Sequence, residues 1–185
     1  MFGELETPRL LLRPVIPADR DDLFALEQDP EVMRFLNGGK PTPPDGIDPS
    51  VDFLMPRGAE QGIWSAREKV SGAFVGWFSL YDHGDGTAEL GYRLRRAVWR
   101  LGYASEGARA LVESGFSRFG FTRIIATTMA VNEASRRVLE KAGLTHVGTF
   151  HVDGPDRLPG AEHGDVEYEI RRETWSAAAQ ITQGA

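Results

Sequence analysis

A short turn built from small residues offers the clearest chemistry in this chain. The segment Trp99-Arg100-Leu101-Gly102-Tyr103-Ala104-Ser105-Glu106 stands between a strand-like stretch, 88–94, and a helical one, 104–116. The first backbone N–H groups of a helix have no partner inside it and lie at the positive end of its dipole. Gly102 lets a bound group come close to the backbone. The turn therefore predicts a site for a phosphate or pyrophosphate, although an ordinary strand-to-helix turn has the same outline.

Asn132 and Ser135 open a second predicted helix, which runs to Lys141 and ends at Gly143. The amide of Asn132 can cap this helix or meet a ligand, and one residue is not expected to do both easily. The hydroxyl of Ser135 can donate a hydrogen bond, although a serine in a first helical turn often bonds the local backbone instead. The chain thus contains, in unbroken order, a strand, the turn, a helix, a second strand, a helix that begins at an asparagine and the glycine that ends it.

The elements that must position these residues follow from hydrophobic periodicity and from Gly and Pro. Strands are predicted at 10–13, 62–67, 73–81, 87–94, 123–130, 145–152 and 166–171, and helices at 19–28, 31–35, 104–116 and 132–141. The β-branched run 123–130 is typical of a buried strand. The segment 37–49 is rich in Gly and Pro and predicts a loop. We expect one domain over 1–175 and a frayed tail over 176–185.

The composition limits the class of protein. The 185 residues are 41% hydrophobic, contain no cysteine and carry a formal net charge of −6. No apolar run reaches the roughly 18 residues of a membrane helix, and the first residues are unlike a signal peptide, so no membrane partner and a cytoplasmic location are expected. The acidic balance argues against a nucleic-acid partner. A cluster of basic residues beside the turn is an exception to the net negative charge and comprises Arg93, Arg95, Arg96 and Arg100.

Two motifs resemble those of the GCN5-related N-acetyltransferase (GNAT) superfamily. The turn is similar to the pattern W-x-x-G-Y-A-[ST]-E, and the segment 132–144 is similar to N-x-x-S-x-x-[VL]-x-E-K-x-G-[FL]. Further likeness at 7–13, 29–35 and 167–170 extends the resemblance over nearly the whole chain. Within the superfamily, the chain looks like the branch that resembles ribosomal-protein N-terminal acetyltransferases.

The resemblance implies a fold and a donor substrate. The fold is an α/β (α+β) domain with a mixed, mostly antiparallel central sheet of about six to seven strands, flanked by helices and splayed at the cofactor site. Acetyl-CoA is the implied acetyl donor. The residues implied to bind it are Tyr92, Arg93 and Leu94 by their backbone, Arg100, Leu101, Gly102, Tyr103, Ala104 and Ser105 around the pyrophosphate, and Asn132 and Ser135 along the pantetheine arm. The 37–49 loop then borders the acceptor cleft, as a substrate lid or as a plain connector.

The implied reaction is direct attack of a primary amine on the thioester in a ternary complex, with Ser135 donating to the departing thiolate. Many superfamily members draw the amine proton through water to a carboxylate near the opened strand. Glu89 is the candidate here, and the alternative is an ion pair with Arg93 on the same face of the strand. His163 and Asp165 are a second candidate pair at the acceptor site, where His163 is otherwise a solvated loop residue.

Two other classes of protein stay open at this point. A non-catalytic acyl-CoA-binding module would keep the fold and the turn, but Glu89, Asn132 and Ser135 argue against it. A kinase-like phosphate-binding enzyme lacks the G-x-x-x-x-G-K-[ST] signature. No metal is expected, because there is no cysteine and the histidines lack metal-like spacing. The acceptor, a protein N-terminus or a small-molecule amine, is not identified by the sequence, and a homodimer is one open form of assembly.

Overall fold

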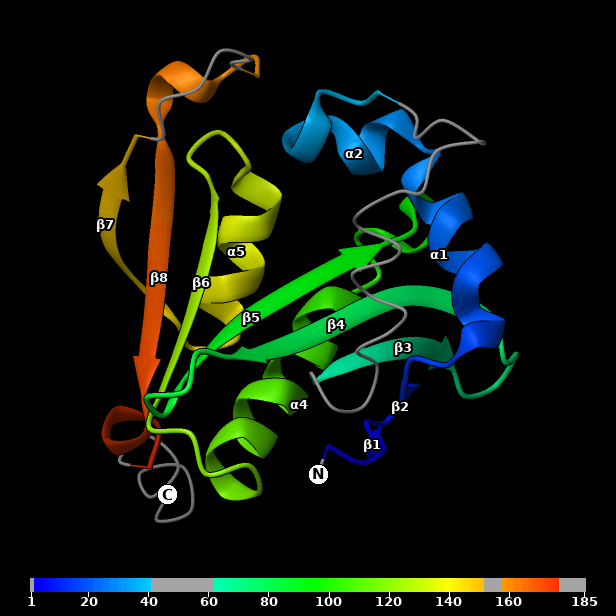
Figure 1. Cartoon of the computed structure of the whole chain (residues 1–185), viewed down its shortest axis with the longest axis horizontal. Coiled ribbons are helices and arrows are strands. Elements are labelled where there is room, and N and C mark those ends of the chain that lie inside the picture. Colours follow the sequence, from blue (N-terminus) through cyan, green and yellow to red (C-terminus); the bar gives the residue numbers. More distant parts are fainter. Residues whose placement is uncertain (1, 41–61, 152–157, 177–185) are drawn as a thin grey trace.

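The structure is a computed structural model that describes residues 2–40, 62–151 and 158–176. Within these residues, the centre is an eight-stranded sheet in the order β1-β2-β3-β4-β5-β6-β8-β7 (Figure 1). The strands are β1 (Leu5–Glu6), β2 (Leu10–Pro14), β3 (Ile63–Glu68), β4 (Phe74–Asp82), β5 (Thr87–Leu94), β6 (Arg123–Met129), β7 (Thr145–Phe150) and β8 (Asp165–Arg171). The helices are α1 (Arg20–Glu27), α2 (Pro30–Asn37), α4 (Tyr103–Ser117) and α5 (Glu133–Lys141), with short 3-10 turns η1 (Pro17–Asp19), η3 (Arg96–Val98) and η4 (Ala161–His163).

The sheet is mixed and mostly antiparallel, which confirms the predicted fold class. Each neighbouring pair of described strands is antiparallel except β5 and β6, which run parallel and are joined through the crossover helix α4. The strand that the sequence did not predict is β1, which pairs with Leu11 and Leu12 of β2. A two-residue strand has no periodicity of its own, so its pairing alone reveals it.

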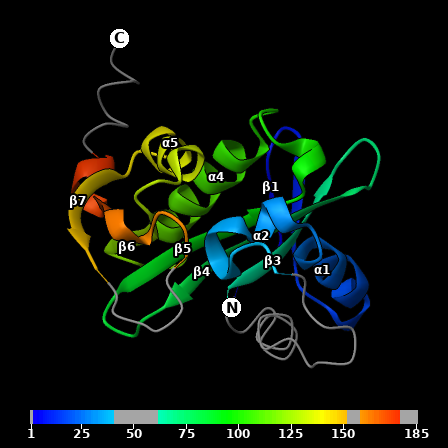
Figure 2. The ribbon, with the colours of Figure 1, turned by 90° about the horizontal axis from the view of Figure 1, so that it is seen from above.

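Helices cover both faces of the sheet. α4 and α5 lie on one face, and α1 and α2 lie on the other (Figures 1 and 2). Alternation along β3 supplies a core to each face, because Trp64 packs in the cluster of Leu111 from α4, whereas Ile63 packs with Leu23 and Leu26 from α1. The two sets of helices are thus held by alternate residues of the same strands.

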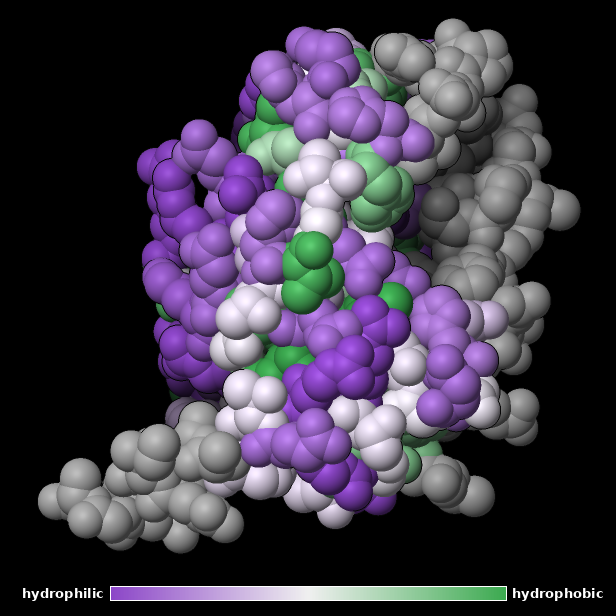
Figure 3. All heavy atoms as spheres, turned by 90° about the vertical axis from the view of Figure 1, so that its left-hand side faces the viewer, coloured by the Kyte–Doolittle hydropathy of each residue, from purple (hydrophilic) through white to green (hydrophobic). Residues whose placement is uncertain are grey.

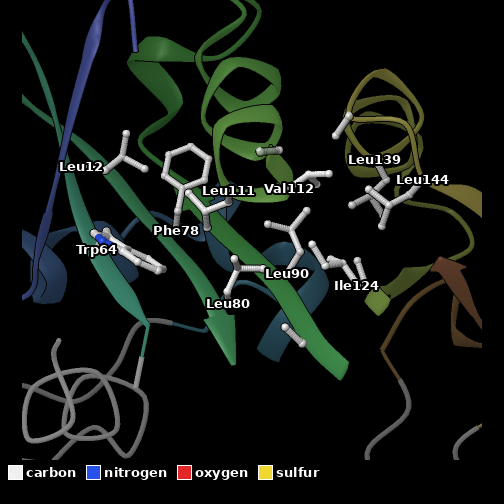
Figure 4. Packing of buried hydrophobic residues seen from close by; sticks show 14 of the residues in the cluster. Leu12, Trp64, Phe78, Leu80, Leu90, Leu111, Val112, Ile124, Leu139 and Leu144 are labelled. Atoms are coloured by element: carbon white, nitrogen blue, oxygen red, sulfur yellow. The ribbon is translucent and has the colours of Figure 1, made fainter. Parts of the chain in front are cut away.

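The larger core lies between α4 and the middle strands (Figure 4). Phe78, Leu90 and Leu111 are buried there, with 0%, 3% and 0% of their surface exposed. A Cβ at Gly107 would stand 2.3 Å from Cζ of Phe78, so the glycine allows α4 to approach β4 closely. This packing fixes the start of α4 beside the end of β5.

Most predicted elements are present, with ends that differ by one or two residues. The strand predicted at 123–130 is present as β6, but it is only partly buried, because it buries Ile124 and Ala126 and leaves Thr127 exposed. The helix that follows β6, α5, lies on one face of the sheet (Figure 1). Because successive side chains of a strand point to opposite faces, half of those in β6 lack this cover. Most of the predicted 37–49 loop and the tail after residue 176 lie outside the described residues.

The strand β7 forms one edge of the sheet, and its residues are largely exposed. The side of the molecule that carries it is mainly hydrophilic, with apolar residues scattered singly (Figure 3). Val147 and Phe150 are among the exposed apolar side chains of this strand. Scattered apolar residues are ordinary on a water-exposed surface. Among the residues that the structure describes, no helix combines the length and the apolar character needed to cross a membrane.

Candidate active site

β5 and β6 separate after a short parallel contact, as the resemblance implied. They pair over Thr87–Glu89 of β5, after which β5 continues along β4 as far as Leu94 and β6 continues along β8 (Figure 1). In the described part of the chain, no strand pairs with the β6-facing edge of Leu90–Leu94. Backbone N–H and C=O groups on such an edge can pair with the amides of an extended ligand. The splayed strands therefore fit a pantetheine arm.

The turn before α4 presents a group of unpaired backbone donors. Gly102 is the N-cap of α4, with φ at 85°, in the left-handed region that glycine adopts without strain. The first N–H of α4 with a backbone acceptor is that of Glu106, which donates to the Gly102 carbonyl at 3.0 Å. The N–H groups of residues 101–105 have no acceptor among the described residues. They lie at the positive end of the helix and fit a pyrophosphate.

The N-terminal segment clamps this turn from outside. Arg9 donates to Glu106 through its backbone N–H, at 2.9 Å, and through Nε, at 2.6 Å, while Thr7 donates to the same carboxylate at 2.6 Å. Nη1 of Arg9 also donates to the Leu101 carbonyl at 2.9 Å. A Cβ added at Gly102 would meet Nη2 of Arg9 at 3.3 Å. The guanidinium of Arg9 therefore holds both sides of the turn and adds positive charge next to it.

The carboxylate of Glu106 is kept ionised by this clamp. Burial favours the neutral acid, but the hydrogen bonds from Thr7 and Arg9 outweigh it and lower the pKa of Glu106. Sequence reasoning missed the clamp, although Thr7, Arg9 and Glu106 all belong to segments that carry the family resemblance. Arg9 and Glu106 stand 97 positions apart, and no local pattern links them.

The basic cluster expected beside the turn is dispersed in the structure. Arg93 pairs with Glu27 of α1, which is buried, and its guanidinium lies 5.3 Å from the ring centroid of Trp77. Arg96 lies 3.7 Å from the Asp29 carboxylate. Arg95 donates to a backbone carbonyl of β4 at 3.4 Å. Arg95, Arg96 and Arg100 are all exposed, and of the four arginines Arg100 lies within the turn itself.

Asn132 caps α5, and the cap leaves half of its amide for other partners. Its Oδ1 accepts the N–H of Ser135 at 3.2 Å, as the capping interpretation requires. Nδ2 has no hydrogen-bond acceptor among the described residues. The capping interpretation is therefore confirmed, and ligand binding stays a prediction, because the cap uses Oδ1 and leaves Nδ2 for another partner.

The Ser135 hydroxyl lies beside a phenol from the opened strand. The hydroxyl of Tyr92 is 3.0 Å from Oγ of Ser135 and donates to the Ser135 carbonyl at 3.1 Å. Burial raises the pKa of Tyr92 despite the hydrogen bond with Ser135, so the phenol stays protonated at neutral pH. The sequence suggested only the backbone of Tyr92, and the 43 positions between the two residues gave no signal for this contact.

Glu89 lies on the other face of β5, at the last pair with β6. Oε2 of Glu89 is 3.2 Å from Nε2 of His83, and Oε1 accepts the hydroxyl of Thr127 at 3.2 Å. The alternative pairing of Glu89 with Arg93 is wrong, because Arg93 lies beneath α1 with Glu27. The side chain of Glu89 is 37% exposed, so a water molecule and a substrate can reach its carboxylate.

The second candidate pair stands apart from Glu89. His163 lies in η4 with 63% of its side chain exposed, 3.7 Å from the carboxylate of Glu162. Asp165 begins β8, opposite Met129 of β6. No hydrogen bond joins His163, Asp165 or Glu89 to one another in the described structure. The exposed position of His163 agrees with a solvated loop residue.

Comparisons with known proteins identify the family to which this fold belongs. The family model described as "Acetyltransferase (GNAT) domain" matches residues 9–145. An Aspergillus fumigatus protein, "FsC-acetyl coenzyme A-N(2)-transacetylase", is 36% identical over 92% of this chain and 77% of its own length. The uncharacterized N-acetyltransferase YoaA of Bacillus subtilis is 32% identical over 81% of this chain and 87% of its own.

A solved GNAT acetyltransferase from Bacillus anthracis superposes with a TM-score of 0.76 at 26% identity, over 92% of this chain and 99% of that structure. The family match covers the anion turn and the start of α5, and the relatives align over most of their lengths. The chain belongs to the GNAT acetyltransferase family and is an acetyl-CoA-dependent N-acetyltransferase.

Proposed function

We propose that acetyl-CoA binds across the opening between β5 and β6, with its pantetheine arm along Tyr92–Leu94 and its pyrophosphate on the N–H groups before and within the start of α4. The separation of the two strands after Glu89 carries this proposal, because it leaves an unpaired strand edge that leads to the turn. Nδ2 of Asn132 is available to an amide carbonyl of the arm. Ser105, buried in the first turn of α4, adds a hydroxyl near the phosphates.

The reaction is a direct transfer between the two bound substrates. The amine nitrogen forms a bond to the thioester carbonyl carbon, the C–S bond breaks, and sulfur leaves with the electron pair as a thiolate. The proton lost by the amine passes through water to Glu89, and Ser135 donates a hydrogen bond to the sulfur. Glu89 projects from one face of β5, and Ser135 of α5 meets Tyr92 on the opposite face. The base and the thiolate donor therefore approach the thioester from different sides.

The acceptor is proposed to be a primary amine of the α-amino type. The relative from Aspergillus fumigatus is named for an N(2) position. Nitrogen 2 of an amino acid is its α-amino nitrogen, and the free end of a protein carries the same group. This proposal therefore includes the acceptors that the resemblance to ribosomal-protein N-terminal acetyltransferases implies. A terminal amine of this type has a pKa near 7.7–8.0, so a modest base such as a carboxylate suffices near neutral pH.

Thiol release from acetyl-CoA tests both parts of the proposal. We expect turnover with amino-acid amides and short peptides that have free N-termini, and little with amines at the ends of alkyl chains, such as polyamines. Calorimetry with acetyl-CoA alone measures donor binding without any acceptor. Absence of donor binding would remove the site assignment. Turnover with alkyl amines alone would leave the site intact and contradict the acceptor class.

Assembly as a homodimer stays a prediction for this protein. The edge strand β7 lies on a mainly hydrophilic side of the molecule (Figure 3). A stable homodimer buries a larger and more apolar surface than scattered single residues provide. We therefore propose that any dimer contact lies away from β7. Light scattering coupled to gel filtration gives the mass in solution, and a β7 charge substitution that dissociates a dimer would contradict this placement.

A further inference from the structure

The Tyr92 side chain reaches the same hydroxyl that we assign to the leaving thiolate. It projects from the opened half of β5 toward α5, where its oxygen lies 3.0 Å from Oγ and 3.1 Å from the carbonyl oxygen of Ser135. Its ring centroid stands 6.1 Å from that of Phe78 in the core. The phenol is therefore held by packing at its base and by Ser135 at its tip.

The two contacts give this hydroxyl pair two hydrogen-bonding arrangements. A phenol has one proton to donate and can accept as well. While Ser135 has no negative partner, Tyr92 can donate to the Ser135 carbonyl and accept the serine proton. Once the serine proton turns toward a thiolate, Tyr92 can donate to Oγ of Ser135 instead. A donor bonded to another donor in this way is polarised and forms a stronger hydrogen bond.

The chemistry favours a hydrogen bond over transfer of the phenol proton. An ordinary thiol has a pKa of about 8.5 and an ordinary phenol a pKa of about 10, so a phenol protonates a thiolate only uphill. Burial of Tyr92 raises its pKa further and widens that gap. The thiolate therefore leaves as an anion held by hydrogen bonds, and it takes its proton later from water.

We propose that Tyr92 is a positioning residue that polarises the Ser135 hydroxyl toward the departing thiolate. This inference rests on the proposed site for acetyl-CoA, and it adds a role for a side chain where the family resemblance implied only backbone. It does not depend on the acceptor, because the thiolate is the same for every amine.

The test is the acidity of the thiol in bound CoA, which needs no acceptor. Hydrogen-bond donors to a thiolate lower its pKa. Removing one neutral hydrogen bond should raise the pKa of the bound thiol by about 0.5 to 1 unit. The ultraviolet absorbance of the thiolate, titrated in the CoA complex, should show this rise in both Tyr92→Phe and Ser135→Ala. The double variant should equal Ser135→Ala, because Tyr92 acts through that hydroxyl.

Tyr168→Phe is the matched control. Tyr168 is also a buried tyrosine that bonds α5, through Glu140 at 3.0 Å and Arg136 at 3.1 Å. Its loss has a similar structural cost and should leave the bound thiol unchanged. With the active acceptor, kcat of Tyr92→Phe should fall about threefold to tenfold at unchanged CoA affinity.

The outcomes separate this inference from the proposed function. Failure of the wild-type protein to bind CoA would overturn both. CoA binding with the same thiol pKa in wild type, Tyr92→Phe and Tyr168→Phe would overturn the role of Tyr92 and leave the binding site standing. Equal shifts in Tyr92→Phe and Tyr168→Phe would make the hydroxyl a purely structural group. Additive shifts in the double variant would show that Tyr92 does not act through Ser135 and would overturn the proposed role. Thermal unfolding of both variants checks that each is folded.

Discussion

The proposed donor side and the proposed acceptor side of the site differ in how firmly the fold holds them. The turn before α4 is fastened by the carboxylate of Glu106, which accepts bonds from Thr7 and from Arg9 twice. Glu89, on the acceptor side, is held by His83 and Thr127 at 3.2 Å each and is exposed. The donor is one constant molecule, so a rigid site suits it, whereas the acceptor region retains open polar groups around the proposed base.

Each half of this comparison leads to its own kind of test. Substitutions at the proposed anion-binding N–H groups of the turn should change the affinity for acetyl-CoA, and substitutions in the clamp that holds the turn should change stability. Variants on the acceptor side should change the rate and its pH dependence while the affinity for acetyl-CoA is preserved. A variant that mixes the two effects would show that the halves are coupled.

Gly102→Asp is expected to give the largest loss. The new carboxylate would stand at the N–H groups proposed for the pyrophosphate, and like charges about 4 Å apart repel by about 4 kcal/mol near a protein surface. We expect acetyl-CoA affinity to fall by about a hundredfold or more in calorimetry. Gly102→Asn is the matched control, because Asn has the same shape as Asp but no charge, and it tolerates the left-handed region. A folded Asp variant that binds as tightly as the Asn variant would rule out this anion site.

Glu89→Gln should lower kcat/KM by about a hundredfold near neutral pH, the low end for a lost general base. The loss should be greatest at low pH. It should shrink as the pH passes the pKa of the amine, where the acceptor is neutral without help. Acetyl-CoA affinity should stay unchanged.

His163→Ala and Asp165→Asn are the competing variants for the base. Rate profiles over pH for all three identify which variant loses the acidic limb. If Glu89→Gln keeps the wild-type pH profile and His163→Ala or Asp165→Asn loses the acidic limb, the general base is to be assigned to the η4–β8 region instead.

Ser135→Ala should lower kcat by about tenfold to a hundredfold, with a small change in acetyl-CoA affinity. The Ser135 N–H that Asn132 caps belongs to the backbone, so the cap survives this substitution. Ser135→Thr keeps a hydroxyl and should recover part of the rate. Equal losses of rate and affinity in Ser135→Ala would make this residue a binding group.

Glu106→Gln should have the smallest effect on catalysis and act on stability. Losing the charge weakens the bonds from Thr7 and Arg9 and should cost about 1–2 kcal/mol, or several degrees in Tm. Because the fold lowers the pKa of Glu106, the stabilisation is complete above the unfolded pKa, near 4.3, and disappears as pH falls through the folded value. Thermal unfolding measured from pH 7 into acid should therefore show a gap between wild type and variant that narrows once the pH falls below about 4.3. A gap that stays constant as the pH falls would contradict an ionic role.

The sequence by itself determined the features that consecutive residues create. Both helix starts depend on local residues: a left-handed glycine precedes α4, and an asparagine caps α5. The sequence pattern therefore predicted the turn before α4 and the start of α5. The alternation of strand residues likewise predicted the main strands. The mixed sheet was implied by the family resemblance. It did not predict β1 or the exposed face of β6, since those depend on which neighbour covers them.

Only the tertiary structure decided which side chains meet. Arg93 pairs with Glu27 and not with Glu89, because α1 brings a buried carboxylate over that part of β5. Tyr92 meets Ser135 because the opening of the sheet lets a β5 side chain reach α5. Hydrogen bonds and ion pairs act over a few ångströms in space, and packing brings together groups that stand dozens of positions apart along the chain.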